Sequence, residues 1–254
     1  MRLEGKRAII TGATGGIGRA AVERFLKEGA HVLAVSRSQD KLDALAAEIA
    51  HDHLATFRAD ISDEADTAAY VAEAKSKMGG LDILFANAGT EGTVKPVFEF
   101  TVEEFDKIMA VNVRGSWLSI KHAAPAMIES GGGSIIVTSS VAGTVGVPGI
   151  SPYAASKHAI NGLVQVAALE LAEAGIRVNS VAPAPIDNAM MRSLENAAAP
   201  GAPEAAQEGF TNLIAMKRYG TNDEVANVAL FLASDESAFC TGAVYPVDGG
   251  FLAA

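Results

Sequence analysis

The stretch Thr11-Gly-Ala-Thr-Gly-Gly-Ile-Gly18 (TGATGGIG) decides the fold that this sequence predicts. It follows a short apolar run, residues 7–11, and precedes a helical pattern that reaches about Glu28. Glycines let the backbone approach a pyrophosphate closely, and a helix N-terminus supplies free N–H groups and partial positive charge. The stretch predicts a dinucleotide-binding turn, with a ligand-free glycine turn as the alternative; its candidate contacts are Gly12, Thr14, Gly16, Ile17 and Gly18.

Apolar, β-rich runs alternate with longer helical patterns on both sides of that turn. The runs cover residues 7–11, 31–36, 55–60, 81–86, 134–140, 176–182 and 243–247. They are continuously apolar, as strands are when crossover helices cover both faces of a sheet. We therefore expect one domain over residues 1–254, of α/β class. Its architecture would be a Rossmann-type, doubly wound, three-layer αβα sandwich around a central parallel sheet of about seven strands.

The composition disfavours several classes of partner. The formal net charge is -10, whereas a phosphate backbone is bound by clustered Lys and Arg, so no nucleic-acid partner is expected. Cys240 is the only cysteine, which makes the cytoplasm the default location. No apolar run approaches the ~18 residues of a membrane span and no export signal is seen, so we expect no membrane partner. His51 and His53 flank Asp52 without a third ligand in view, and no metal site is predicted.

Polar residues follow the predicted strands at the edge where doubly wound sheets bind ligands. The second strand ends at Ser36 and Arg37, where an acid would bind the ribose hydroxyls of NAD. A guanidinium can instead pair with a 2'-phosphate, so we expect NADP(H) to be preferred, with NAD(H) as the second possibility and a solvated arginine as the alternative. Asp60 could accept a hydrogen bond from adenine, or it could cap a helix, as Ser62 or Asp63 could.

The stretch Tyr153-Ala-Ala-Ser-Lys157 sets a phenol and an ammonium on one face of a predicted helix. At ~4.5 Å and an effective dielectric constant of ~20, the ammonium would favour the phenolate by ~3.7 kcal/mol, enough to lower the phenol pKa by ~2 to 3 units. Ser140, after the fifth strand, offers a hydroxyl that could hold a carbonyl or alkoxide oxygen. This pattern predicts acid–base catalysis, and an ordinary polar pair on a helix is the alternative.

In their order and spacing, these motifs resemble those of the short-chain dehydrogenase/reductase family. The resemblance spans nearly the whole chain and includes the glycine turn, Asp60, Asn-Ala-Gly at 87–89, Asn112, YAASK and Val-Asp-Gly-Gly at 247–250. It implies a catalytic tetrad of Asn112, Ser140, Tyr153 and Lys157. By this resemblance Tyr153 is the general acid for ketone reduction, and Lys157 lowers its pKa and binds the nicotinamide ribose. Asn112 would hold a helix distortion and a water.

The resemblance also implies the remaining cofactor contacts. After the sixth strand the family usually carries Pro-Gly and then a Thr, where this chain has Ala184 and Asn188. Asn188 can still hydrogen-bond a carboxamide, whereas Ala184 adds a methyl group near the nicotinamide ring. The implied contacts are Ser36, Arg37, Asp60, Ile61, Asn87, Ala88, Gly89, Tyr153, Lys157, Pro183, Ala184, Ile186 and Asn188.

Residues 186–219 resemble the variable substrate lid of the family. Methionines adapt to irregular apolar shapes, so we expect a small hydrophobic ketone or secondary alcohol, with simple packing of the lid as the alternative. The implied activity is that of a NAD(P)-dependent short-chain alcohol dehydrogenase or ketoreductase. The expected substrate contacts are Ser140, Ala142, Val147, Tyr153, Met190, Met191 and Phe210.

Two other functions are ranked below this one. Reduction of 3-oxoacyl groups on acyl carrier protein is second, because Glu129 and Glu173 lie where that branch tends to place basic residues. A non-catalytic dinucleotide-binding sensor is third, because such relatives typically lose the tyrosine or lysine that this chain keeps.

The helical pattern at 111–128 and the one after Tyr153 are apolar on more than one face, and the resemblance implies a homotetramer.

Overall fold

The computed structural model describes residues 1–253 and contains one parallel sheet in the strand order β3-β2-β1-β4-β5-β6-β7. The predicted fold class is confirmed, and each predicted strand is present with its ends shifted by no more than two residues. Because the chain returns from β3 to pair β4 with β1, the strand order reverses beside β1. The strands are β1 Arg7–Thr11, β2 His31–Ser36, β3 Leu54–Arg58, β4 Ile83–Ala86, β5 Gly133–Thr138, β6 Ile176–Pro183 and β7 Val244–Val247.

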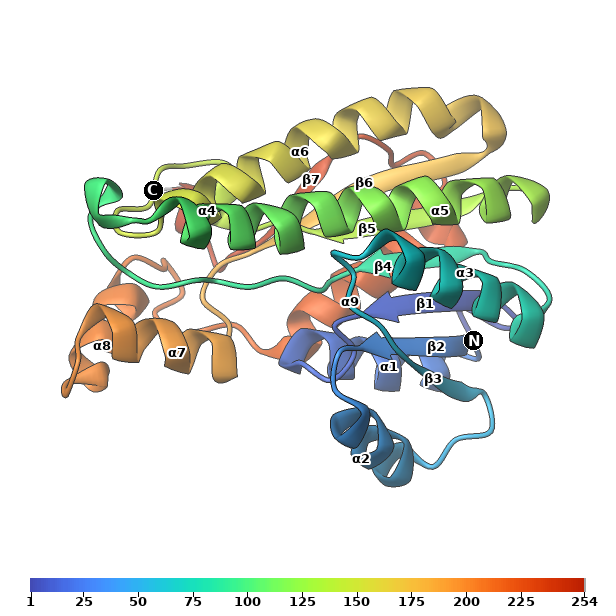
Figure 1. The fold of residues 1–254 in the computed structure, drawn as a ribbon, viewed down its shortest axis with the longest axis horizontal. Helices are drawn as coiled ribbons and strands as arrows, with labels where there is room; N and C mark the ends of the chain where they lie inside the picture. The colour runs from blue at the N-terminus through green and yellow to red at the C-terminus, as the bar shows by residue number, and fades with distance from the viewer. Residues whose placement is uncertain (254) are drawn as a thin grey trace.

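Helices cover both faces of the sheet (Figure 1). One face packs against α1 Gly16–Lys27, α2 Gln39–Ile49 and α9 Asn222–Ala233. The other packs against α3 Glu64–Met78, α5 Gly115–Glu129 and α6 Ser151–Leu171. The remaining segments are α4 Val102–Met109, α7 Ala189–Ala198, α8 Pro203–Asn212, the π-helical η2 Ala110–Arg114, and the 3-10 turns η1 Val97–Glu99, η3 Val141–Gly143, η4 Ala172–Ala174, η5 Asp235–Ser237 and η6 Phe251–Ala253.

The continuous apolarity of the strands follows from this double cover. Successive side chains of a strand point to opposite faces, so both alternating sets must be apolar when helices lie on each side. In β1, Ala8 and Ile10 pack with α1 and α9, whereas Ile9 packs with α3, α5 and α6. Within residues 1–253, no helix combines the length and the apolarity that a membrane crossing needs.

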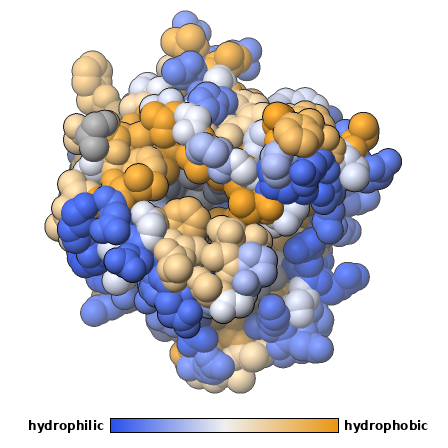
Figure 2. Space-filling view, turned by 90° about the vertical axis from the view of Figure 1, so that its left-hand side faces the viewer, coloured by the Kyte–Doolittle hydropathy of each residue, from blue (hydrophilic) through white to orange (hydrophobic). Residues whose placement is uncertain are grey.

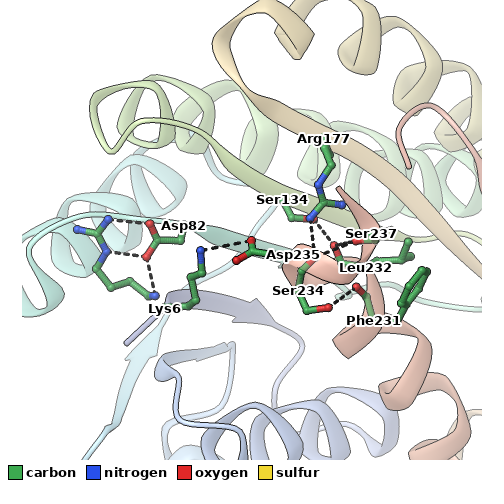
Figure 3. A network of polar contacts seen from close by, with 10 residues as sticks. Lys6, Asp82, Ser134, Arg177, Phe231, Leu232, Ser234, Asp235 and Ser237 are labelled. Carbon is green, nitrogen blue, oxygen red and sulfur yellow. Dashed lines mark hydrogen bonds and ion pairs between the residues drawn. The ribbon is translucent and has the colours of Figure 1, made fainter. Parts of the chain in front are cut away.

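A polar network closes the amino-terminal edge of the sheet (Figure 3). Arg7, at the start of β1, donates through Nε and Nη2 to the two carboxylate oxygens of Asp82, each at 2.7 Å. Arg177, at the start of β6, donates through Nη2 to the Ser234 carbonyl oxygen at 3.1 Å. Ser134, at the start of β5, donates to the Leu232 carbonyl oxygen at 2.7 Å. The first contact joins the starts of β1 and β4, and the other two tie the starts of β6 and β5 to the end of α9.

Candidate active site

A cavity of about 420 Å³ opens at the carboxyl edge of the sheet. Its walls come from the turns after β1, β2, β3, β4, β5 and β6, from the start of α6 and from the lid helices α7 and α8. Figure 2 shows this side of the molecule, where apolar side chains surround a hollow. The predicted site residues that line the cavity are Gly12, Thr14, Gly16, Ile17, Ser36, Arg37, Asp60, Ile61, Asn87, Ala88, Gly89, Ser140, Ala142, Val147, Tyr153, Lys157, Pro183, Ala184, Ile186, Asn188, Met190, Met191 and Phe210.

The glycine turn brings the first strand close to its neighbours. Gly12 has a φ of +66°, and a Cβ atom on it would lie 2.9 Å from the Cα of Ala88. A Cβ on Gly16 would lie 2.5 Å from Oδ1 of Asn222. Helix α1 begins at Gly16, so its first N–H groups lack intrahelical partners at the cavity wall. A helix N-terminus in this position can bind the negative charge of a pyrophosphate.

Some residues considered in the sequence lie away from the cavity lining. Gly18 packs against the turn, where a Cβ would collide with the Gly12 carbonyl oxygen, so it shapes the turn from behind the wall. Asn112 likewise lies behind the lining residues. His53 stacks on His31 with ring centroids 3.8 Å apart, at the opposite edge of the sheet where β2 and β3 begin.

The turn after β2 forms one end of the cavity. The hydroxyls of Thr14 and Ser36 lie 2.8 Å apart, which links the glycine turn to this strand. Arg37 is exposed at the cavity margin and close enough to Asp60 for its charge to help lower the pKa of that carboxyl. A guanidinium in this position is accessible to an anionic group of a ligand.

Asp60 is anchored by the residue two positions later. Its Oδ1 accepts hydrogen bonds from the Ser62 backbone N at 2.9 Å and from the Ser62 hydroxyl at 2.7 Å. Burial opposes ionisation, but these bonds and the charges of Arg37 and Arg114 hold the pKa of Asp60 below its usual value. Asp63 is the residue that caps α3, with its carboxylate accepting from the Asp66 backbone N at 2.9 Å. Asp60 is therefore free of the capping role and lines the cavity.

Asn87-Ala88-Gly89 is fixed between β1 and β5. The Thr11 hydroxyl accepts from the backbone N of Asn87 and of Ala88, each at 3.1 Å, and the Thr138 hydroxyl donates to Oδ1 of Asn87 at 3.0 Å. A Cβ on Gly89 would lie 3.6 Å from Nζ of Lys157. The turn after β4 therefore places its backbone next to the amine of Lys157.

Asn112 lies in the π-helical segment η2, between α4 and α5, and is 1% exposed. The helix distortion expected at Asn112 is therefore present. Its Oδ1 accepts from the Thr90 backbone N at 2.8 Å, and its Nδ2 donates to the Thr90 carbonyl oxygen at 2.9 Å and to the Ser156 hydroxyl at 3.0 Å. Since Thr90 lines the cavity, Asn112 positions that wall and connects it to the helix that carries Tyr153.

The two adjacent serines after β5 point to different partners. Ser139 donates to the Lys157 carbonyl oxygen at 3.3 Å and so holds the backbone of α6. Ser140 accepts from the Ala142 backbone N at 3.1 Å and donates to the Pro183 carbonyl oxygen at 3.5 Å, and its hydroxyl works to lower the pKa of Tyr153. The second serine is therefore the one whose hydroxyl accompanies the phenol.

Burial dominates the electrostatics of Tyr153 and Lys157. Burial raises the pKa of Tyr153 to about 12, against the effect of Ser140 and with a further rise from the charge of Glu91. Burial also lowers the pKa of Lys157 to about 8. Nζ of Lys157 donates to the Thr138 carbonyl oxygen at 2.7 Å and lies 5.5 Å from the centroid of the Tyr153 ring. Burial therefore sets the direction of the phenol pKa in this structure, and the lowering by Lys157 that the sequence suggested stays a prediction.

Asn188 carries a local structural role beside the predicted cofactor contact. It caps α7, with Oδ1 accepting from the backbone N of Met190 at 3.0 Å and of Met191 at 3.3 Å. Its Nδ2 donates to Oδ1 of Asn222 at 3.2 Å. Both polar atoms of the side chain are thus engaged with protein groups where a carboxamide contact was expected. Ala184 lines the cavity and is held by a bond from its N to the Val247 carbonyl oxygen at 3.2 Å.

The far end of the cavity is lined by apolar side chains. Ala142, Val147, Met190, Met191 and Phe210 were predicted there. The cavity also has apolar lining residues that were not predicted as contacts. Two of them, Leu194 and Leu213, belong to the predicted lid range, and the rest follow no motif because they come from loops and from the end of the chain. The apolar lining residues that sequence reasoning did not name as contacts include Val94, Pro148, Ile150, Leu194, Leu213 and Phe251.

The lid is closed at its base by a buried ionic cluster. Glu195 of α7 is 2% exposed, and its carboxylate accepts from the Tyr219 hydroxyl at 2.9 Å and from Nη1 of Arg192 at 2.8 Å. The two ends of the lid pair through a bridge between Ile186 and Gly220. A lid with both ends fixed in this way is a firm support for the cavity wall.

Comparisons with known proteins agree over nearly the whole chain. A family model described as "Enoyl-(Acyl carrier protein) reductase" matches residues 12–252. Levodione reductase of Leifsonia aquatica is 38% identical over 257 residues, which cover 100% of this chain and 96% of that protein. Short-chain dehydrogenase reductase 3a of Arabidopsis thaliana is 41% identical over 252 residues, covering 99% and 96%. The crystal structure of levodione reductase superposes with a TM-score of 0.97 at 38% identity and covers 100% of both chains.

Proposed function

This chain belongs to the short-chain dehydrogenase/reductase family, and we propose that it is a NAD(P)-dependent oxidoreductase that interconverts a small hydrophobic ketone and its secondary alcohol. The observation that carries the proposal is the joint placement of Ser140, Tyr153 and Lys157 on the cavity into which the glycine turn opens. Bound at that turn, the dinucleotide supplies or removes a hydride at the substrate carbon. The residues of the chain handle the proton.

In the reductive direction, the Tyr153 hydroxyl donates its proton to the ketone oxygen, and the Ser140 hydroxyl donates a hydrogen bond to the same oxygen. A pKa of about 12 keeps the phenol protonated at neutral pH, in the form that a proton donor needs. The Lys157 ammonium then stabilises the phenolate that is left. With Nζ 5.5 Å from the ring centroid, Coulomb's law gives about 3 kcal/mol at an effective dielectric constant of about 20. Alcohol oxidation reverses these steps.

We propose NADP(H) as the preferred cofactor, with NAD(H) as the second choice. Arg37 lies at the cavity margin beside Ser36, after the strand where an acidic residue would favour NAD. A guanidinium can bind a 2'-phosphate with two parallel hydrogen bonds. Asp60 is close enough to Arg37 to feel its charge, and both line the same end of the cavity.

The apolar far end of the cavity supports a hydrophobic ketone as the substrate. Val147, Ile150, Met190, Met191 and Phe210 offer no charge to a ligand. The name of levodione reductase, which is similar over the whole chain, records a reductase that acts on a dione. A small cyclic or aryl ketone is accordingly the substrate class we propose.

Reduction of 3-oxoacyl groups on acyl carrier protein is the second candidate, and the description of the matching family model favours a carrier-bound substrate, although it names an enoyl group. The charges disfavour it. Glu129 is exposed and paired with Lys75 at 2.6 Å, Glu173 is exposed, and the net charge of -10 repels an acidic carrier. A turnover of a 3-oxoacyl carrier thioester far above that of free ketones would reverse this ranking.

The assay that tests the proposal follows NADPH and NADH oxidation by absorbance over cyclohexanone, 3-methylcyclohexanone, acetophenone and a 3-oxoacyl carrier thioester. We expect oxidation with at least one free ketone and a higher kcat/KM for NADPH. If none of the ketones were reduced, the enzyme assignment would be contradicted. If the protein still bound the dinucleotide in that case, the sensor function would take its place.

We further propose a homotetramer in the cytoplasm. The side chains of Trp117 on α5 and of Val166 and Leu169 on α6 are apolar and exposed, with Leu169 at 81%. Exposed apolar faces of this kind are typical of surfaces that a partner covers. Light scattering should give about four times the mass of one chain, and a monomeric mass would contradict the tetramer. A single cysteine fits a reducing compartment.

A further inference from the structure

The C-terminal turn after β7 forms part of the cavity wall. Phe251, in η6, lines the cavity and is partly buried against the lid cluster of Met191, Ile214 and Tyr219. Phe210 of α8 packs on the same cluster and also lines the cavity. Two aromatic rings from segments about 40 residues apart thus share one apolar wall.

The backbone around Phe251 is held by one carboxylate. Asp248 accepts from the backbone N of Gly250 through Oδ1 and from the backbone N of Leu252 through Oδ2, each at 2.9 Å. The backbone N of Phe251 donates to the Asp248 carbonyl oxygen at 3.1 Å. Three bonds to one residue fix the backbone that carries the Phe251 ring, and the packing of the ring on the lid cluster makes it a rigid part of the wall.

Two glycines bring the same turn into contact with the lid. The backbone N of Met216 donates to the Gly249 carbonyl oxygen at 3.0 Å. A Cβ on Gly249 would lie 2.8 Å from Cγ2 of Ile214, and one on Gly250 would lie 2.9 Å from Cβ of Ala215. Their φ values of +56° and +86° also favour glycine. The lid end and the C-terminal turn therefore form one continuous structure.

We propose that Phe251 is a specificity-determining residue that limits the bulk of the ketone. The inference rests on the proposed function and names the feature of the substrate that is selected, which is the size of its hydrocarbon part. Because the ring is held by the Asp248 turn and packed on the lid, a substituent on the ketone cannot push it aside without breaking those contacts. Cyclohexanone is small enough to bind in front of the Phe251 ring, whereas the aryl group of a larger ketone would collide with that ring.

The test compares Phe251→Ala with Leu252→Ala in the full-length protein. Leu252 is the neighbouring residue, similarly half-buried, and lies outside the cavity lining. For Phe251→Ala we expect the ratio of kcat/KM for 4-phenylcyclohexanone over cyclohexanone to rise about tenfold, mainly through KM. A single methylene in a hydrophobic pocket is already worth about 10 to 200-fold in discrimination. For Leu252→Ala the ratio should stay within about twofold.

A ratio that does not change in Phe251→Ala, or that rises equally in Leu252→Ala, would overturn the proposal. Should the alanine variant lose its fold by thermal melting, Phe251→Leu keeps most of the apolar volume and should give a smaller rise in the same direction. The affinity of 4-phenylcyclohexanone, measured by calorimetry with NADP⁺ present, separates two failures. A wild-type protein that turns over no ketone refutes the proposed function, and the calorimetric difference between the two alanine variants still decides the role of Phe251.

Discussion

Tyr70 and Tyr153 show how differently two parts of this molecule use the same side chain. Burial raises the pKa of each phenol to about 12. Tyr70, on α3, is fully buried and donates to the Ser119 hydroxyl at 2.8 Å, inside the packing between α3 and α5. Tyr153, on α6, lines the cavity beside Ser140. A raised pKa alone therefore does not identify a functional residue. What distinguishes Tyr153 from Tyr70 is that it lines a cavity that a ligand can enter.

The two edges of the sheet repeat this contrast. At the amino edge, the Arg7 guanidinium and the Asp82 carboxylate satisfy each other through two bonds of 2.7 Å. At the carboxyl edge, the Tyr153 hydroxyl and the Arg37 guanidinium face the cavity. The polar groups at the amino edge bond to each other and stabilise the fold. Those at the carboxyl edge line the cavity, where a ligand can contact them. Substitutions at the two edges should accordingly change different measurable quantities.

The largest expected effect comes from removing the cavity phenol. Tyr153→Phe should lower turnover of a cyclic ketone by about 10² to 10⁴-fold, the usual scale for a general acid, while the melting temperature and dinucleotide affinity change little. Tyr70→Phe is the matched control. It should leave turnover within about twofold and cost about 1 kcal/mol of unfolding free energy through the lost bond to Ser119. Wild-type turnover in Tyr153→Phe would refute the role of this residue.

The next effect is a pH dependence of stability that Lys157 causes. Its pKa is about 8 in the folded chain and ~10.5 when unfolded, so the unfolded state binds more protons between these values. The contribution of Lys157 to stability therefore rises with pH across this window, and below pH 8 its buried charge is a cost. Relative to Lys157→Met, the wild-type unfolding free energy should rise by about 2 to 3 kcal/mol from pH 7 to pH 10.

Urea unfolding of both proteins at several pH values measures this difference. Lys157→Met serves as the control, because it shares every other titrating group with the wild-type protein. Parallel pH profiles for wild type and Lys157→Met would show that the lysine is solvated in the folded chain.

A smaller effect is expected at the amino edge. Asp82→Asn removes the charged acceptor of Arg7 and should cost about 2 kcal/mol of unfolding free energy, because a hydrogen bond to a charged group is worth about 1.5 to 3 kcal/mol. Lys6→Ala, which removes a more exposed pair with Asp235 at 3.5 Å, should change stability by no more than about 0.5 kcal/mol. Turnover should stay within about twofold in both variants. A large loss of turnover in Asp82→Asn would break the division between the edges.

The smallest effect concerns cofactor choice. Arg37→Ala should raise the KM for NADPH about tenfold and leave the KM for NADH within about twofold, because only the first carries a 2'-phosphate. Arg58→Ala, at the exposed end of β3 and outside the cavity lining, should change neither value. Equal changes for the two cofactors in Arg37→Ala would remove the reason to expect an NADP(H) preference.

The sequence predicted what depends on local spacing. The seven strands follow from runs of apolar residues, and the glycine turn follows from the spacing of Gly12, Gly16 and Gly18. Tyr153 and Lys157 lie one helical turn apart because they are four residues apart on α6. The order of these motifs along the chain also placed them at one edge of the sheet, since parallel strands share their carboxyl ends.

Features that depend on contacts between distant segments could not be predicted in this way. Phe251 reaches the cavity only because the Asp248 turn packs on the lid, and the Glu195–Tyr219 contact joins α7 to the end of that lid. The cap that Asn188 forms could have been suspected, since asparagine is a favoured N-cap. The effect of burial on the pKa of Tyr153 could not be predicted, because the spacing gives the distance to an ammonium and says nothing about burial.

The most direct test of the proposed chemistry is the fate of a labelled hydride. Cyclohexanone is incubated with the wild-type protein and NADPH carrying deuterium at C4 of the nicotinamide on the transferred face, and the product is examined by mass spectrometry. If the cavity binds both molecules beside Tyr153 as proposed, the cyclohexanol formed carries one deuterium on its carbinol carbon. If cyclohexanol forms without deuterium, or does not form while NADPH is bound, this cavity does not carry out the hydride transfer that we propose.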